Sequence, residues 1–161
     1  MTGKSSSILI GVLVYIIVGL LLQFIASGSQ VAGAFLGCLF PLACAMVAVW
    51  HYTSNNNLTI PAGEGAGMGA LVGLIGAIIG GILALVLVSM GVLPDPMDAA
   101  MENMRAQGLN EEQIEQAMGF AGSMTGVFGI IIGTVFGAVL GAVGGAIGAS
   151  VFKKGGDAPV V

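Results

Sequence analysis

The sequence predicts an all-α integral membrane protein with four transmembrane helices and an amphipathic helical hairpin between the third and the fourth. Hydrophobic residues make up 57% of the 161-residue chain, charged residues make up only 7%, and the mean hydropathy is +1.04. A soluble domain carries about 25% charged residues, so this chain lacks the polar side chains that would cover a water-facing surface. Four separate apolar stretches are each long enough to cross a hydrocarbon core of about 30 Å, which takes about 20 helical residues.

The charge balance excludes several classes of function. Eight Asp and Glu against four Lys and Arg leave no basic surface for nucleic acid, so we expect no nucleic-acid partner. The four apolar stretches contain no Asp, Glu, Lys or Arg, the residues that mark proton relays and ion pathways inside a membrane. We therefore expect a single, non-enzymatic membrane domain over residues 1–161, with no catalytic residue, no metal site and no cofactor. A small oligomeric channel or transporter stays open as an alternative, because backbone carbonyls can line a pore without charged side chains.

The first two predicted spans cover residues 8–26 and 31–50. Lys4 and the small residues after the first span resemble a signal peptide, but the apolar run is longer than the 7 to 15 or so residues of such a core, so we predict a retained helix. Only residues 27–30 separate the two spans. A connection this short predicts an antiparallel pair of helices.

The third predicted span covers residues 66–92, and residues 51–65 before it are polar and rich in turn residues, which predicts an irregular loop at the membrane surface. Pro94 and Pro96 end this span. Residues 95–121 hold six of the eight acidic residues, and Gly108 divides them into two helical pieces that form an acidic amphipathic hairpin. The second piece begins with Asn110 and Gln113 at the spacing of a capping box. Apolar residues at helical spacing make a candidate docking face for a partner, and these are Met97, Met101, Met104, Ile114 and Met118.

Glycine is placed at four-residue spacing in the last two spans. The fourth predicted span covers residues 127–152, and its five regularly spaced glycines are Gly129, Gly133, Gly137, Gly141 and Gly145. The spaced glycines at the start of the third span and within it are Gly65, Gly69 and Gly73, followed by Gly76 and Gly80. A glycine at every fourth residue leaves one helix face without side chains, so that another backbone can approach it closely. Two partners for such a glycine zipper stay open: the third and fourth spans against each other, or a second copy or other subunit outside the chain.

The basic residues predict the orientation in the membrane. With four spans, both termini lie on one side, together with Lys4, Lys153 and Lys154, whereas the other side has only Arg105. The positive-inside rule then places both termini in the cytoplasm of a bacterial inner membrane, with the acidic hairpin on the opposite side.

His51 is the single histidine, and it lies beside Trp50 and Tyr52 at the predicted membrane boundary. Imidazole is a common axial ligand, so His51 is a candidate for binding haem or chlorophyll, with Met68 near the same boundary as a second haem ligand. The alternative is an interfacial histidine that hydrogen-bonds to the loop or to water within an aromatic belt. We favour this second interpretation.

The layout resembles a bacterial family of small four-helix membrane proteins known only as a domain of unknown function. The resemblance covers most of the chain and is carried by Leu58-Thr59-Ile60 before Gly63-Glu64-Gly65-Ala66-Gly67-Met68-Gly69-Ala70, by Pro94-Asp95-Pro96, by residues 101–105 and 110–118, and by the last span ending in Phe152-Lys153-Lys154. It implies an integral membrane protein with four helices and implies no activity.

These observations together predict an accessory or scaffolding subunit of a larger membrane protein complex. Its expected partners are the lipid bilayer and either other membrane protein subunits or further copies of the same chain.

Overall fold

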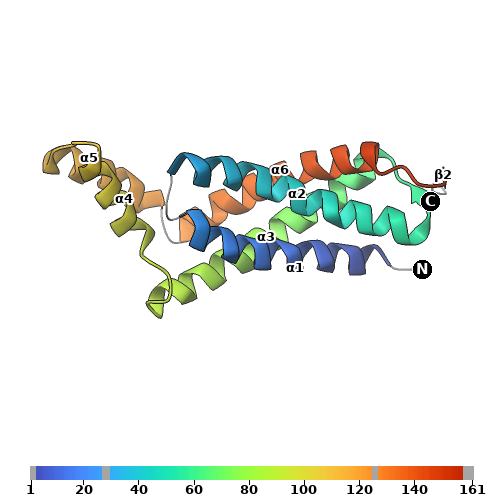
Figure 1. Ribbon diagram of the computed structural model, residues 1–161, viewed down its shortest axis with the longest axis horizontal. Coiled ribbons are helices and arrows are strands. Elements are labelled where there is room, and N and C mark those ends of the chain that lie inside the picture. The colour runs from blue at the N-terminus through green and yellow to red at the C-terminus, as the bar shows by residue number, and fades with distance from the viewer. Residues whose placement is uncertain (1–2, 27–29, 125–126, 158–161) are drawn as a thin grey trace.

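The computed structural model describes residues 3–26, 30–124 and 127–157, and its described part is built almost entirely from helices. The four long helices are α1 (Lys4–Ala26), α2 (Gln30–Asn56), α3 (Ala62–Ser89) and α6 (Val127–Val151). They run side by side in one elongated bundle, and each is long and apolar enough to cross a membrane (Figure 1). The predicted fold class is confirmed: the chain is an all-α, multi-pass membrane protein with a helical hairpin, α4 (Pro96–Ala106) and α5 (Glu111–Met124), between its third and fourth long helices.

The two ends of the bundle differ. The start of α1 and the end of α6 lie at one end of the bundle, which we call the terminal end, and the α4–α5 hairpin projects from the other (Figure 1). At the terminal end, β1 (Leu58–Thr59) pairs in parallel with β2 (Gly156–Asp157), which ties the segment after α6 to the α2–α3 connection. Lys4 Nζ lies 2.6 Å from Glu64 Oε1 and joins the start of α1 to α3. The predicted connection between the first two spans includes residues 27–29, which lie outside the described residues.

The prediction of an irregular loop over residues 51–65 is wrong for most of its length, because the structure leaves only residues 57–61 outside helices α2 and α3. The polar side chains that suggest a loop instead satisfy the backbone of the helix end. Thr53 Oγ1 donates to the carbonyl of Val49 at 3.0 Å, and this hydroxyl is fully buried. α2 ends only where Asn57 takes a left-handed backbone conformation, with φ of 50°.

The α4–α5 hairpin has its own local stop and start signals. Asp95 caps α4 by accepting a hydrogen bond from the Met97 amide at 2.8 Å, and Gly108, with φ of 81°, follows the end of α4. The predicted capping box is confirmed: the Gln113 amide donates to Asn110 Oδ1 at 2.8 Å, and the Asn110 amide donates to Gln113 Oε1 at 3.1 Å. The hairpin therefore takes its shape from its own sequence.

α2 contains Pro41 within its helical run, a feature that the predicted spans do not take into account. Proline has no N–H, so it cannot donate to the carbonyl of Gly37 one turn earlier. Such a break is tolerated in a membrane where neighbouring protein covers the backbone. α6 packs on α2 directly after this proline, because a Cβ placed on Gly144 would lie only 2.7 Å from the Cα of Leu42.

Candidate functional site

The closest helix contact in the molecule lies between α3 and α6, and we call it the glycine seam. It consists of three glycines of each helix, which face one another in antiparallel order as the pairs Gly65 with Gly145, Gly69 with Gly141, and Gly73 with Gly137. All six are buried. On five of the six, a Cβ would overlap the backbone of the facing glycine, and on Gly137 it would lie 3.0 Å from the Gly73 carbonyl oxygen. The seam therefore has no room for any side chain.

The contact across the seam is reciprocal. The hydrogen that stands in place of a side chain on Gly69 points at the carbonyl oxygen of Gly141, and the corresponding hydrogen of Gly141 points back at the carbonyl of Gly69. Contacts of this Cα–H to oxygen type contribute about 0.5–1 kcal/mol each. Two backbones at this distance also gain dispersion energy along the whole seam. The α3–α6 pair is therefore held by main-chain atoms.

The seam ends at Ala77. The next antiparallel step would set Ala77 against Gly133, and the Cβ of Ala77 lies 3.2 Å from the position that a Cβ on Gly137 would take. Beyond this methyl group the two backbones no longer touch, because a Cβ on Gly133 would meet no atom within 4 Å, and α6 reaches α3 there through the side chain of Ile130, 3.1 Å from a Cβ on Gly81. Gly129 and Gly133 line a cavity instead, together with Gly80. These three glycines, although on the predicted tracks, lie outside the seam.

Gly76 faces a different helix from the seam glycines. A Cβ on Gly76 would lie 2.6 Å from Cγ of Tyr15 on α1, so this glycine makes room for an aromatic ring. The Tyr15 ring in turn packs on Phe40 of α2, with ring centroids 4.5 Å apart. The sequence does not predict this contact, because single aromatic residues within an apolar helix carry no periodic signal.

α6 has a second glycine face, which packs on α2. A Cβ on Gly144 would lie 2.5 Å from the Leu42 carbonyl oxygen, whereas a Cβ on Gly148 would lie 3.3 Å from the Cα of Met46. α6 therefore has backbone contact to α3 on one face and to α2 on another. Four-residue spacing is visible in the sequence for this pair as well, since Gly144 and Gly148 are one turn apart.

Both ring nitrogens of His51 have partners within the chain. Asn55 Nδ2 donates to Nε2 at 2.8 Å, and Ser7 Oγ lies 3.0 Å from Nδ1. A neutral imidazole that accepts at Nε2 carries its proton on Nδ1, so it donates to the Ser7 hydroxyl. Neither nitrogen can bind a haem iron or a chlorophyll magnesium without losing a hydrogen bond. Met68, the second ligand considered, is packed in an apolar cluster with Val49, Ile60 and Ala149.

Metal-ligating side chains are also scattered. Within residues 3–26, 30–124 and 127–157, no group of three or more His, Cys, Asp or Glu side chains lies close enough to hold a metal ion. The absence of a cofactor remains a prediction.

We expect Ser7→Ala to destabilise the bundle by about 1–3 kcal/mol, because it leaves the His51 Nδ1 proton without a buried partner. Ser6→Ala is the matched control, since Ser6 is the exposed neighbour of the fully buried Ser7. Denaturant unfolding of the detergent-solubilised protein, followed by circular dichroism, measures both variants. Equal stability of the two variants would show that the hydrogen bond between Ser7 and His51 does not stabilise the bundle.

The predicted docking residues of the hairpin are only partly accessible. Ile114 is 3% exposed and is therefore taken up by packing, and the four methionines of the set are half-buried. All six acidic residues of the hairpin are exposed, and these are Asp95, Asp98, Glu102, Glu111, Glu112 and Glu115. The two helices are joined by a bidentate contact in which Arg105 Nε and Nη2 donate to the Glu111 carboxylate at 3.2 and 3.4 Å. The surface that the hairpin presents is therefore mainly acidic.

The comparison with known proteins agrees with the architecture and assigns no activity. No curated protein and no solved structure matches the chain. A family model with the description Protein of unknown function (DUF4199) matches residues 6–154, which include all of the glycine seam and the hairpin. This match confirms the resemblance to a domain of unknown function. The chain belongs to the family described as Protein of unknown function (DUF4199).

Proposed function

We propose that this protein is a non-enzymatic accessory or scaffolding subunit of a larger membrane protein complex, packed through its glycine-rich helices. The observation that carries the proposal is the contrast between a bundle closed by backbone contacts and a hairpin that projects beyond it (Figure 1). A rigid anchor with a separate, self-capped surface suits a subunit that positions a partner.

The glycine seam favours packing over transport. A pore along the glycine face would need α3 and α6 to stand apart, whereas Gly69 and Gly141 have no space between them for even a methyl group. The small oligomeric channel or transporter therefore has less support than the accessory subunit. The haem or chlorophyll carrier has the least support, because both ring nitrogens of His51 are hydrogen-bonded within the chain.

The charge of the hairpin suggests the chemistry of its partner. Glu112 and Glu115 are exposed on α5, and the one basic residue of the hairpin, Arg105, is already paired with Glu111. An acidic surface of this kind fits a basic extramembrane surface on another membrane protein, because opposite charges steer and orient the encounter.

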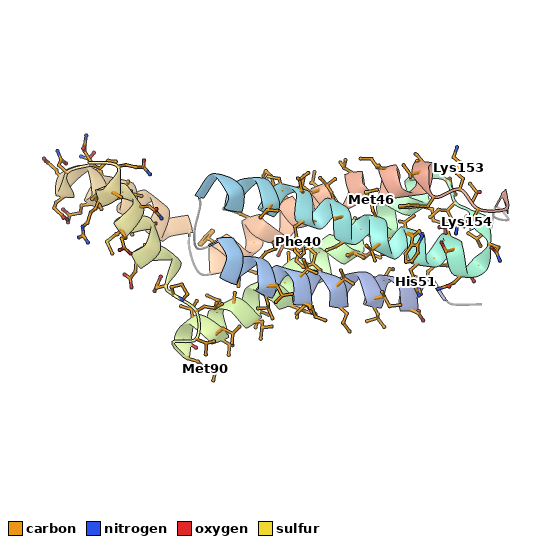
Figure 2. All side chains as sticks on the ribbon, viewed as in Figure 1. Phe40, Met46, His51, Met90, Lys153 and Lys154 are labelled. Atoms are coloured by element: carbon orange, nitrogen blue, oxygen red, sulfur yellow. The ribbon has the colours of Figure 1, made fainter. Side chains whose placement is uncertain are left out.

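We place the termini in the cytoplasm and the hairpin on the opposite side of a bacterial inner membrane. Lys153 and Lys154 lie at the terminal end of the bundle (Figure 2), and Lys4 is also at this end. At the opposite end Arg105 is paired with Glu111. This asymmetry supports the positive-inside orientation.

The test uses the full chain, extracted from its native membranes in a mild detergent and separated under native conditions. We expect it to migrate with other membrane subunits at a fixed stoichiometry. Glu112→Lys with Glu115→Lys should release these subunits, and Glu112→Gln with Glu115→Gln should weaken the association less, because it removes charge without reversing it. The isolated variants should keep the thermal unfolding midpoint of the wild type.

Two results would contradict the accessory role. One is migration of the chain alone or only as copies of itself, whatever mild detergent is used. The other is rapid solute flux in liposomes that contain only this protein, which would favour the channel or transporter. An unchanged complex after the double charge reversal would leave the hairpin without the docking role.

A further inference from the structure

The bundle forms a cavity of about 460 Å³, open on one side, in the half where the α3–α6 seam has opened. Residues of α1, α2, α3 and α6 line it, and they are aliphatic, glycine or aromatic. The volume corresponds to about fifteen molecules of liquid water, but the apolar walls offer water few hydrogen-bond partners. It is also within the range of about 300–1,000 Å³ typical of small-molecule sites.

Tyr15 supplies the one polar side chain among the lining residues. Its ring lies along α3: a Cβ on Gly76 would be 2.6 Å from Cγ, and a Cβ on Gly80 would be 4.0 Å from Cε1. The hydroxyl lies beyond Cε1 and so points past Gly80, which lines the cavity. Among the described residues, this hydroxyl has no hydrogen-bond partner.

The depth of Tyr15 restricts what can satisfy its hydroxyl. Tyr15 is the midpoint of α1 (Lys4–Ala26), so it lies near the middle of the hydrocarbon core. At this depth the acyl chain of a phospholipid offers no hydrogen-bond acceptor, because its ester and headgroup oxygens lie in the interfacial regions. An unpaired hydroxyl in apolar surroundings is unfavourable, so the matching occupant carries an accepting oxygen on an otherwise apolar body.

The walls of the cavity favour a flat occupant. Phe40, in the middle part of the bundle (Figure 2), packs on Tyr15 with an interplanar angle of 52°, and both rings border the cavity. Gly37, Gly80 and Gly133 contribute backbone surface without side chains. Aromatic rings and bare backbone give flat contact area, which suits a planar ring more than a branched chain.

We propose that this cavity is a binding site for a lipid-soluble quinone-type molecule, whose ring lies among Tyr15, Phe40 and the glycine walls and whose carbonyl accepts a hydrogen bond from the Tyr15 hydroxyl. The site is reached from the membrane and goes beyond the accessory role, because it concerns a ligand inside the bundle and not a partner at the hairpin.

The test measures binding of menadione, a small naphthoquinone, to the purified full chain by equilibrium gel filtration in detergent, with empty micelles as the blank. We expect one saturable site per chain. Tyr15→Phe keeps the ring and removes the hydroxyl, so it should weaken binding about fivefold. Gly133→Leu should abolish binding by filling the cavity, since a Cβ there meets no atom within 4 Å. Gly67→Leu is the matched control, because Gly67 also has open space around it and does not line the cavity.

The outcomes separate cleanly. The site is supported if the wild type and Gly67→Leu bind saturably and Tyr15→Phe binds more weakly. It also requires that Gly133→Leu no longer binds although it keeps its thermal unfolding midpoint. Binding no greater than that of empty micelles overturns it, as does equal binding by the wild type and Gly133→Leu. The quinone assignment is overturned if the wild type and Tyr15→Phe bind menadione equally and hexadecane displaces it from both. That result shows a site for acyl chains.

Discussion

Gly69→Leu is expected to prevent formation of a stable bundle. Its Cβ alone would overlap the Gly141 carbonyl, and it would also lie 2.9 Å from the Cα of Gly145, so α3 and α6 would have to separate along the whole seam. Forcing a larger side chain into a packed site commonly costs about 1–3 kcal/mol. Here the obstructing atoms belong to two helix backbones that cannot rotate away, so we expect a loss of at least about 3 kcal/mol. Denaturant unfolding in detergent, with size-exclusion chromatography for aggregation, measures the loss.

Gly67→Leu on the same helix is the control for this prediction. Gly67 is exposed and a Cβ there meets no atom within 4 Å, so leucine adds only lipid-facing apolar surface. This variant should unfold within about 0.5 kcal/mol of the wild type. Both variants have the same composition and the same gain in helix propensity, and they differ only in the face that carries the leucine. If both lose stability equally, the seam is not the structural centre of the bundle.

Gly144→Ala is expected to produce the second largest loss, although it adds a single methyl group. That methyl carbon would lie 2.5 Å from the Leu42 carbonyl oxygen and 2.7 Å from the Leu42 Cα, directly after Pro41. We expect a cost of about 2 kcal/mol, of the size seen for overpacked cores.

Gly148→Ala tests whether the effect of Gly144→Ala depends on distance or on the substitution itself. At Gly148, one turn further along α6, the nearest atoms to the new methyl are the Met46 Cα and the Val49 side chain at 3.3 Å, which a small shift accommodates. The better helix propensity of alanine, up to about 1 kcal/mol in water, offsets that shift. The unfolding midpoint of Gly148→Ala should therefore stay near that of the wild type, and a loss as large as that of Gly144→Ala would contradict the distance argument.

The fold class and the capping box are readable from the sequence because they depend on local rules. Four long apolar runs must form helices in a bilayer, because every backbone polar group needs a partner there. Asn110 and Gln113, three residues apart, each accept a hydrogen bond from the backbone amide of the other. The sequence does not predict that both ends of the segment 51–65 are helical. Threonine and asparagine side chains can hydrogen-bond to the backbone either in a turn or in their own helix. The choice at Thr53 depends on a buried setting that only the folded bundle provides.

The glycine tracks illustrate a different limit of sequence reasoning. Spacing places Gly129, Gly133 and Gly137 on one face of α6, but it does not show where a second helix departs from that face. The departure point depends on the single methyl group of Ala77 and on the Tyr15 ring, which lies on α3 from another helix. The cavity follows from this divergence, so only the three-dimensional arrangement reveals it.

The two glycine faces of α6 have a consequence for how the protein is made. α6 is the last of the long helices to be synthesised, yet it packs on both α2 and α3. Until it inserts, α3 stands in the lipid with its glycine track uncovered. The closest helix pairing of the bundle is therefore made last, after α1, α2 and α3 are already in the membrane.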